Sequence, residues 1–590
     1  MDYIINVIII RNLKMKLRFL FLSILFVIGC SSGSEVEEII GDGGNNNGGG
    51  NTGGETDPDK YTDSKSGGNT TYYINFSGGD DSKDGKSEAN AFKNLGKINS
   101  ITFAPGDKIN FKTGDTWKGY FKLRGSGNAS SPITIGSYGS SGKPIIDGNG
   151  YQASMFLENV EYVEINNLEF KNETSHKKSN GDVKLMHGSS RSGQDERFGI
   201  LALRFGAGKN INHLKVSNVK ISNIYPTPNE DSYKHQGYGM RFESYNNSEI
   251  NYYDGISIDN VDISLTGHYG IHIVNRMSST QADFYHRNIS ITNSKFHDTG
   301  GSGIVVARSK NILIEDSSFK GTGSTKDSRM WERGSGLWMY TCNDVIVQKS
   351  IFEDAYGVQD SFGAHIDWGN ERVVIQYCLS KNNFGGFVEI LGENLDCGYR
   401  YNISIGDGTR TGVHNGKIFW VSDFAGANRK IGSKNNFIYN NTVFIPTTNP
   451  VTSSPMNPDL LIRENTEDTF IYNNLIYINS GASMTIKIDN NQDLNFFRNN
   501  LYFGNVQINN NSAFEHHSSE IFSDPKLVNP GSIDANDYKL QPLSPAIGKG
   551  ILITGSNDVK NFINNNGGRD YFGNSVSNSE KPNIGAYNGS

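Results

Sequence analysis

The chain has 590 residues, a formal net charge of −7 and 35% hydrophobic residues, with 68 glycines and only 15 prolines. This composition favours many short strands joined by turns over long helices. Its mild acidity and the lack of a basic stripe argue against nucleic-acid binding. An aromatic content of 11% excludes a wholly disordered chain, and the length predicts one large domain with additions, or two or three domains.

Residues 15–30, MKLRFLFLSILFVIGC, have the features of an export signal, because Lys16 and Arg18 precede a short apolar run that ends in Val27-Ile28-Gly29-Cys30. This ending resembles the lipobox of bacterial lipoproteins, in which the cysteine becomes the lipid-modified first residue. The run is too short for a comfortable membrane span. We therefore predict a signal peptide over residues 1–30 with lipidation at Cys30, which leaves the lipid anchor as the only membrane contact.

A Gly- and Asn-rich stretch, GDGGNNNGGGNTGGETD, follows and predicts a flexible linker over residues 31–70. The acidic residues at its start, Glu35, Glu37 and Glu38, resemble the surface-export signals of outer-membrane lipoproteins in Gram-negative glycan degraders. The expected location is the outer membrane, with the protein lipid-anchored and exposed at the cell surface.

Short strand-like segments recur from residue 165 onward, and several of them bend at an Asn. They are INNLEF (165–170), VSNVKI (216–221), IDNVDI (258–263), ITNSKF (291–296), IEDSSF (314–319), VQKSIF (347–352), YNNTVF (439–444), YNNLIY (472–477) and RNNLYF (498–503). Strands repeated every few tens of residues predict a parallel β-solenoid. An Asn at each bend suits a left-handed backbone position or a side-chain ladder.

A second series of strands runs in phase with the first, and each of its members opens on a glycine. It comprises GILALR (199–204), GMRFES (239–244), GIHIVN (270–275), GIVVAR (303–308), GLWMYT (336–341), GAHIDW (363–368) and GGFVEI (385–390). A sandwich would pair its strands antiparallel and does not explain two series with one repeat. We therefore predict an all-β fold, a right-handed parallel β-helix over residues 71–590 with N- and C-terminal caps.

Both ends of this region carry recognisable segments. YYINFSGGDDSKDGKSEANAFKNLGKI and PGDKINFKTGDTWKG lie near its start, and DYKLQPLSPAIGKG and KPNIGAYNG lie near its end. They resemble the terminal coils of the pectate-lyase-like β-helix superfamily, and the resemblance extends over most of residues 71–590. It implies extracellular carbohydrate chemistry but no single reaction, because the superfamily contains lyases, hydrolases, epimerases and non-catalytic proteins.

In the second series, the first and third residues after each glycine are mostly apolar and are expected to point into the core. The second and fourth residues then point outward, because successive side chains of a strand alternate. The outward positions are rich in aromatic, histidine and charged residues, which is typical of a carbohydrate-binding face. They include Arg241, Glu243, His272, Trp338, Tyr340, His365, Asp367 and Glu389.

Asp367 and Glu389 occupy the same position after the leading glycine of successive coils. Because neighbouring strands lie about 4.8 Å apart, we expect the two carboxylates to lie about 5 to 7 Å apart, within the range of glycosidase pairs. Proximity should raise one pKa and create a general acid, with His365 orienting a carboxylate or a sugar. Asp360, in the preceding loop, is a further acid that could reach this place. The alternative is a structural role for the acids, in Ca²⁺ binding or in hydrogen bonds to turns.

Arginines in loops and at strand ends suggest an anionic, sulfated or uronic, glycan, because guanidinium groups fork onto carboxylates and sulfates. They include Arg276, Arg308, Arg329 and Arg333, with Lys310 beside them. Only three cysteines remain beyond Cys30, namely Cys342, Cys378 and Cys397, without a CxxC spacing. This argues against disulfides and zinc, so we expect them to be buried as small apolar side chains.

The leading hypothesis is a glycoside hydrolase that degrades an extracellular polysaccharide, anionic or sulfated and algal among the candidates. Asp367 and Glu389 would be its catalytic pair and His365 would orient them; Trp338, Tyr340 and Trp368 would hold sugars, and Arg241, Glu243, His272, Arg308 and Arg333 would bind substrate. Such hydrolysis requires no cofactor, and we expect a monomer. A polysaccharide lyase is the second hypothesis, with His, Tyr or Arg as base and Ca²⁺ or Arg as neutraliser. A non-catalytic surface glycan-binding protein is the third.

Overall fold

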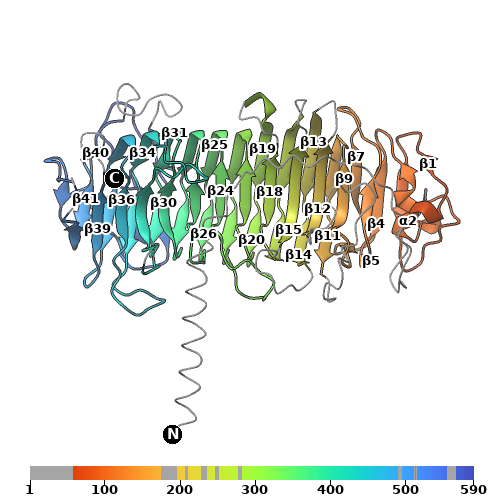
Figure 1. The fold of residues 1–590 in the computed structure, drawn as a ribbon, viewed down its shortest axis with the longest axis horizontal. Coiled ribbons are helices and arrows are strands. Elements are labelled where there is room, and N and C mark those ends of the chain that lie inside the picture. The colour runs from red at the N-terminus through yellow and green to blue at the C-terminus, as the bar shows by residue number, and fades with distance from the viewer. Residues whose placement is uncertain are drawn as a thin grey trace, which may run out of the picture.

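The structure is a computed structural model that describes residues 58–173, 196–205, 210–226, 236–245, 251–276, 282–412, 414–489, 495–510, 512, 514–553 and 566–589. In these ranges the chain winds through three long parallel sheets, as the predicted right-handed parallel β-helix requires (Figure 1). Each coil contributes one strand to the first, the second and the third sheet in turn. The predicted fold class is confirmed.

The first sheet has 14 strands: β2 (Thr71–Ile74), β4 (Lys108–Lys112), β7 (Ile133–Tyr138), β10 (Val163–Asn166), β13 (Ile211–Ser217), β16 (Tyr253–Asp259), β19 (His286–Thr292), β22 (Ser309–Glu315), β25 (Asn343–Gln348), β28 (Glu371–Gln376), β31 (Leu395–Arg400), β34 (Lys434–Tyr439), β37 (Glu467–Tyr472) and β40 (Asn495–Arg498). The second sheet also has 14: β5 (Thr116–Lys118), β8 (Ile145–Asp147), β11 (Glu169–Asn172), β14 (Lys220–Ile224), β17 (Asp262–Thr266), β20 (Lys295–His297), β23 (Ser318–Lys320), β26 (Ile351–Glu353), β29 (Leu379–Lys381), β32 (Ile403–Ile405), β35 (Thr442–Ile445), β38 (Leu475–Ile478), β41 (Leu501–Phe503) and β43 (Ile521–Phe522). The third sheet has 13: β6 (Phe121–Leu123), β9 (Ala153–Glu158), β12 (Glu196–Phe205), β15 (Gln236–Tyr245), β18 (Ile271–Asn275), β21 (Ile304–Ala307), β24 (Leu337–Tyr340), β27 (Ala364–Ile366), β30 (Gly386–Ile390), β33 (Lys417–Val421), β36 (Asp459–Ile462), β39 (Met484–Ile488) and β42 (Val506–Ile508).

A small cap precedes the coils at the N-terminal end of the stack. It contains the helix α2 (Leu95–Asn99), the 3-10 turns η1 (Pro58–Lys60) and η2 (Glu88–Asn90), and the strand pair β1 (Ser64–Lys65) and β3 (Ile101–Thr102). Further 3-10 turns are η3 (Ala282–Phe284) and η5 (Ala535–Tyr538). Because β1 pairs with β3, folded structure begins inside the predicted linker and before the predicted boundary at residue 71. The predicted signal peptide with Cys30 and most of the linker lie outside the described residues.

The recurring Asn residues mark the corner between the first and second sheets. At this corner the backbone is left-handed, with φ of 58° at Asn167, 53° at Asn218, 53° at Asn440 and 56° at Asn473. Asn tolerates this conformation better than other residues with a side chain. The Asn pattern in the sequence therefore records a backbone requirement of every coil.

A ladder of buried asparagines runs along the inside of this corner in the later coils. The side-chain amide of Asn402 donates to Asn441 at 3.0 Å, Asn441 donates to Asn474 at 3.0 Å, and Asn474 donates to Asn500 at 3.1 Å. Each side-chain oxygen also accepts a backbone N–H of the coil before it, as Asn441 does from Asn402 at 3.0 Å. The ladder therefore satisfies buried polar groups that would otherwise be costly.

The core is formed by the inward side chains of all three sheets. Phe296, Phe319 and Phe352 stack at ring distances of 4.9 and 4.8 Å between successive coils of the second sheet. The inward residues predicted for the third sheet, such as Met240 and Ile366, lie in this core. Cys342, Cys378 and Cys397 are free and buried, as predicted.

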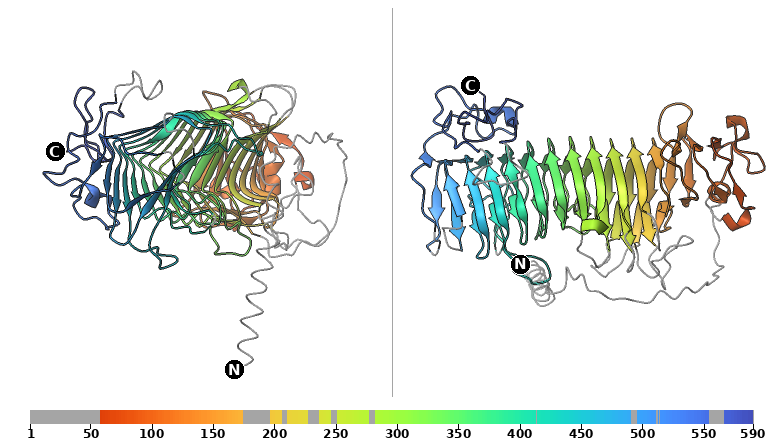
Figure 2. Two further views of the ribbon diagram at one scale, coloured as in Figure 1. Left: turned by 60° about the vertical axis from the view of Figure 1, so that its left-hand side comes forward. Right: turned by 90° about the horizontal axis from the view of Figure 1, so that it is seen from above.

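The C-terminal segment leaves the stack and packs on the outside of its later coils (Figure 2). Asn440 donates from its side chain to the carbonyl of Asn583 at 2.8 Å, and the Tyr377 hydroxyl donates to the carbonyl of Gly567 at 2.8 Å. This segment therefore braces the side of the coils between β28 and β41. In the part of the chain that the structure describes, no helix is long and apolar enough to cross a membrane.

Candidate functional site

The candidate site lies on the outer face of the third sheet, where β24, β27 and β30 are neighbours. His365 pairs in register with Trp338 of the preceding coil. Ile366 pairs with Ile390, and Phe362 forms a bridge with Gly386. The residue numbers differ by the same amount in both pairings, so the residue opposite His365 in the next coil is Glu389.

This register corrects the predicted pairing of Asp367 with Glu389 at one position of successive coils, which is wrong. Counting from the leading glycines placed the strand after Gly385 two residues out of register. A slip of two preserves the face of every side chain, so Glu389 still points outward but lies diagonally from Asp367. With a strand spacing of about 4.8 Å and a rise of about 3.3 Å per residue, their Cα atoms lie roughly 8 Å apart.

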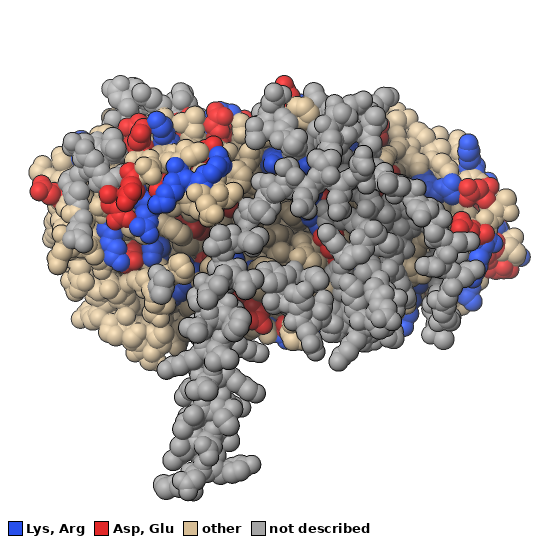
Figure 3. All heavy atoms as spheres, in the orientation of Figure 1, with Lys and Arg blue, Asp and Glu red and all other residues tan. Residues whose placement is uncertain are grey.

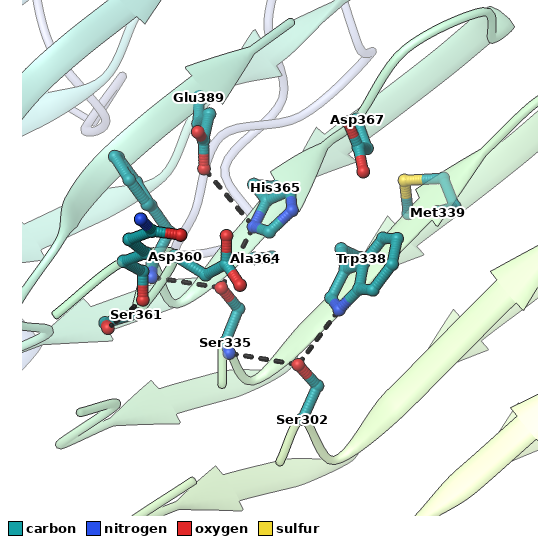
Figure 4. A network of polar contacts seen from close by, with 12 residues as sticks. Ser302, Ser335, Trp338, Met339, Asp360, Ser361, Ala364, His365, Asp367 and Glu389 are labelled. Atoms are coloured by element: carbon teal, nitrogen blue, oxygen red, sulfur yellow. Dashed lines mark hydrogen bonds and ion pairs between the residues drawn. The ribbon is translucent and has the colours of Figure 1, made fainter. Parts of the chain in front are cut away.

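His365 is the centre of a buried polar network (Figure 4). Its Nδ1 atom lies 2.9 Å from the Ser335 hydroxyl and 3.3 Å from Glu389 Oε2. The Ser335 hydroxyl also accepts the backbone N–H of Phe362 at 3.1 Å. His365 and Glu389 are only 3% and 4% exposed. Burial lowers the pKa of His365 to about 4, which makes it a neutral imidazole at physiological pH.

Asp360, predicted only as a further acid that could reach this place, belongs to the same site. It lies in the turn before β27, where Asp360 and Ser361 have successive left-handed φ values of 54° and 69°. The Ser361 hydroxyl is hydrogen-bonded at 2.9 Å to the carbonyl of Gly357 and to that of Gln359. Non-glycine residues in this conformation store strain and cluster at functional sites. The turn aims Asp360 at the network around His365 (Figure 4).

Two arginines hold Asp360. Arg333 donates from Nε to its carboxylate at 2.7 Å, and Arg410 donates from Nη1 to its backbone carbonyl at 3.1 Å. Burial disfavours the ionised form of Asp360, but the charge and hydrogen bond of Arg333, together with the charges of His365 and Arg410, lower the pKa of Asp360 below its ordinary value. Asp360 is therefore a carboxylate at neutral pH.

Asp367, at the other end of β27, is in the opposite state. Burial, reinforced by the charge of Asp360, raises the pKa of Asp367 from 3.8 to about 8. Two buried side-chain amides fix its backbone, because Asn370 and Asn394 donate to the Asp367 carbonyl at 2.7 and 2.8 Å. Burial also raises the pKa of Glu389 well above its ordinary value, helped by Asp360 and then by Asp367. The site thus combines one carboxyl group whose pKa is lowered with two whose pKa values are raised, which is the arrangement that acid–base catalysis requires.

A row of part-exposed aromatic side chains borders these acids, as predicted. Trp338 stacks on His365 at 5.7 Å and on Tyr340 at 5.6 Å, and Tyr340 lies 5.4 Å from Trp368. The Trp338 indole N–H donates to the Ser302 hydroxyl at 2.9 Å, so its ring has a fixed orientation. Such a row can stack against sugar rings.

A third tryptophan, which was not predicted from the sequence, lies on the far side of Glu389. Trp420 of β33 pairs in register with Glu389. The glycine-led series continues in this coil, because Gly416 precedes KIFWV, and Trp420 is the fourth residue after that glycine, an outward position by the same count. Continuing the coil spacing by one step would have found it.

Four residues predicted to bind substrate lie on earlier coils of the same face. Arg241 is 1% exposed, lies 2.8 Å from Glu243 and 3.0 Å from Glu196, and forms a buried charge network. His272 stacks on Tyr238 at 6.0 Å, and Arg308 donates to the Asn275 carbonyl at 3.0 Å. Arg241 is four coils from His365 in the register, or roughly 19 Å at the strand spacing. Their role in substrate binding stays a prediction.

The other arginines that suggested an anionic glycan are engaged with carboxylates. Arg276 lies 2.6 Å from Glu243, and Arg329 lies 2.7 Å from Asp327 and 2.8 Å from Glu173. On the face shown in Figure 3, basic and acidic side chains lie side by side at both ends of the described surface. Within the described ranges, no group of three or more His, Cys, Asp or Glu side chains is placed to hold a metal ion.

Comparisons with known proteins agree with the fold. A family model described as "Right handed beta helix region" matches residues 207–397. The chain is 24% identical over 490 residues to the lacto-N-biosidase of Bifidobacterium longum subsp. longum, an alignment that covers 69% of this chain and 29% of that enzyme. The chain thus spans less than a third of the length of this curated relative.

Two crystal structures of the GH136 lacto-N-biosidase from Eubacterium ramulus, a native and a selenomethionine form, are similar to this structure with a TM-score of 0.51 and 19% identity. The similarity covers 74% of this chain and 67% or 68% of that chain. At this level of identity the likeness shows the fold.

Proposed function

We propose that this protein is a glycoside hydrolase in which Asp360 and Asp367 are the reacting carboxyl pair. The observation that carries the proposal is that the surroundings shift their pKa values in opposite directions, in the turn before β27 and just after its end. The pKa of Asp360 is lowered and that of Asp367 is raised to about 8. The 24% identity to a lacto-N-biosidase supports glycoside hydrolysis as the reaction class.

A sugar bound over His365 would lie between the two aspartates, with its ring against Trp338 and Tyr340. Asp367 donates its proton to the glycosidic oxygen as the bond to the anomeric carbon breaks. Asp360 supplies the negative charge that the oxocarbenium-like transition state needs, and it acts on the anomeric carbon either directly or through a water. NMR of the first product distinguishes these routes, because direct attack retains the anomeric configuration and water attack inverts it.

This assignment changes the predicted role of Glu389. The pKa values of Glu389 and Asp367 are both raised, so these two acids together lack the carboxyl group of lowered pKa that a catalytic pair needs. Glu389 instead lies against His365 and, in this proposal, holds the imidazole and a sugar hydroxyl. The substrate is an extracellular oligo- or polysaccharide, with lacto-N-biosides and anionic or sulfated algal glycans as the first candidates. Lipidation at Cys30 would place the enzyme on the outer-membrane surface as a monomer.

A polysaccharide lyase is the second candidate, because the low pKa of His365 leaves a neutral imidazole that can accept a proton. Its reaction removes the proton next to a uronate carboxylate and leaves an unsaturated product. The aromatic row alone would also serve the third candidate, a glycan-binding protein without catalysis.

The test uses protein lacking residues 1–30, incubated with lacto-N-biosides and with plant and algal polysaccharides. New reducing ends and the ultraviolet absorbance of unsaturated uronates are followed in the same samples. Reducing ends without absorbance, lost in Asp360→Asn and in Asp367→Asn, are expected. Absorbance that rises with the reducing ends would establish the lyase, and retention on a glycan gel without either signal would establish the binding protein.

A further inference from the structure

Arg410 lies beside the reacting pair and is a buried cation that has no acidic partner among the residues that the structure describes. It lies in the loop between β32 and β33 and is 6% exposed. Its Nε donates to the His414 carbonyl at 2.6 Å and its Nη1 to the Asp360 carbonyl at 3.1 Å. Among the described residues, no carboxylate lies within ion-pair distance of its guanidinium. Both partners are neutral carbonyls, so the positive charge is not cancelled by direct contact.

A buried guanidinium of this kind is costly. Arg stays protonated in proteins, and a charge taken out of water without a counter-charge loses its hydration energy. Burial lowers the pKa of Arg410, although the nearby Glu389 and Asp360 oppose this effect. A ligand that carries the opposite charge would remove this cost, which makes Arg410 a candidate binding residue.

The charge balance of the site leaves Arg410 in excess. Arg333 and Asp360 form a direct ion pair, so their charges cancel. His365 and Glu389 are in contact at 3.3 Å. Their net charge is zero whether the proton that they share lies on the imidazole or on the carboxyl group. Asp367 must hold its proton at the start of the proposed reaction and is then neutral. One positive charge therefore remains when the enzyme is ready to act.

The neighbouring coils also carry more positive than negative charge. Lys417, at the start of β33, pairs in register with Gly386 of the site strand. Lys417 and Lys487 approach one carboxylate, Asp459, at 3.1 and 3.0 Å. Arg333, Arg410, Lys417 and Lys487 thus form a cationic rim at this end of the site strands, against the two carboxylates of Asp360 and Asp459.

We infer that Arg410 binds a negatively charged substituent, a carboxylate or a sulfate ester, on the sugar that occupies the site beside Asp360. This inference rests on the proposed function, because it specifies the substrate of the same site. A hydroxyl group could accept a hydrogen bond from Arg410 but would leave its charge unbalanced. An anion accepts the hydrogen bond and also balances the charge. The second Nη of the planar guanidinium offers donors for it. Asp360 does not repel such a group strongly, because Arg333 already neutralises it.

The first experiment compares three forms of one glycan backbone, a neutral, a sulfated and a uronate form. Wild-type protein is expected to prefer one charged form, and which form it prefers distinguishes sulfate from carboxylate. Arg410→Gln should reduce kcat/KM for that form about 30-fold or more, the cost of truncating one partner of a buried charge pair. The neutral form should change less than about threefold. Arg463→Gln, on the same face and paired with Asp489 at 2.7 Å, is the matched control and should leave both values unchanged.

The second experiment needs no catalysis. Sodium sulfate and glucuronate are titrated into wild-type protein and into Asp360→Asn, with sodium chloride of equal ionic strength and glucose as controls. One of the two anions should raise Tm and bind measurably in calorimetry, and Arg410→Gln should abolish both effects. Arg410→Lys keeps the charge but not the planar fork and should bind more weakly than wild type.

Two results would overturn the inference. Equal losses on neutral and charged substrates in Arg410→Gln would make Arg410 a positioning residue for Asp360. Wild-type protein that neither prefers charged substrates nor binds either anion would also refute it, whatever the folding of the variants. Anion binding that depends on Arg410 in a protein that cleaves no glycan would refute the proposed hydrolase and leave the inference standing.

Discussion

Replacing Asp367 with Asn should stabilise the protein at neutral pH while removing its activity. The carboxyl group of Asp367 has a pKa of about 8 in the folded protein, against an ordinary value of 3.8. The folded state therefore holds the proton more tightly than the unfolded state. The stability that this proton contributes is complete below about pH 4 and is lost as the pH rises to about 8.

The size of the effect follows from this window. Each pH unit between the two pKa values costs about 1.4 kcal/mol of unfolding free energy. At pH 7 wild-type protein has therefore lost about 4 kcal/mol that the Asn variant, which does not titrate, keeps. Activity should fall about 10²- to 10⁴-fold, the usual contribution of a general acid.

The assay is calorimetry of both proteins from pH 4 to pH 8, supported by hydrogen exchange of the amides in β24, β27 and β30. Exchange is needed because solenoids can unfold in parts. The Tm difference should be smallest at pH 4 and grow steadily toward pH 8. Asp316→Asn, in an exposed turn at a corner of the stack, is the control and should show no such trend. A difference that is flat with pH would refute the raised pKa and with it the assignment of Asp367 as the acid.

Four further predictions concern the site and the stack. Arg333→Gln removes the cation that lowers the pKa of Asp360, so the acid limb of the kcat/KM profile should move up by about one pH unit or more; an unmoved limb would mean that Asp360 is not the ionised group. Trp338→Ala should raise KM about tenfold with little change in kcat, measured by initial rates on a short oligosaccharide; an unchanged KM would remove the aromatic row from the binding site. Asn441→Ala breaks the asparagine ladder and should reduce the free energy of unfolding by about 3 kcal/mol in denaturant titrations, while KM stays constant. Treatment with EDTA should leave activity unchanged, because a carboxyl pair hydrolyses without metal; loss of activity restored by Ca²⁺ would favour the lyase.

Much of the fold could be predicted from the sequence because a solenoid is specified locally. Alternation of apolar and polar residues defines which side of each strand is buried, and the Asn at the first corner reports a left-handed φ in that coil alone. Neither signal depends on distant residues. The start of the folded region was less predictable, because the short pairing of β1 with β3 joins segments far apart in the sequence.

The site could be predicted only in part, for the same reason. The alternation correctly places His365, Asp367 and Glu389 on the outer face, since it is insensitive to a slip of two residues. The slip itself changes which acid faces His365, and only backbone pairing through Gly386 reveals it. Asp360 and Arg410 lie in a turn and a loop, where no periodic pattern indicates the direction of a side chain.

The stack supports the energetic cost of this site with specific contacts. Two buried acids with raised pKa values, a buried guanidinium and two left-handed residues all destabilise the coils that carry them. The ladders of buried side-chain amides start in these same coils. Ser317 and Ser350 occupy one corner position in earlier coils. Asn402 and the asparagines of the ladder occupy the same position in later coils.

Two of these ladders act directly on the reacting pair. Asn370 and Asn394 hold the carbonyl of Asp367. Asn383 accepts the backbone N–H of Ala355, in the turn that leads to Asp360, and is itself anchored by Asp407 at 2.8 Å. The ladders therefore fix both ends of the strand between the two aspartates, so each carboxyl group stays in the environment that sets its charge. Asn residues that satisfy the backbone of the solenoid thereby also preorganise its catalytic groups.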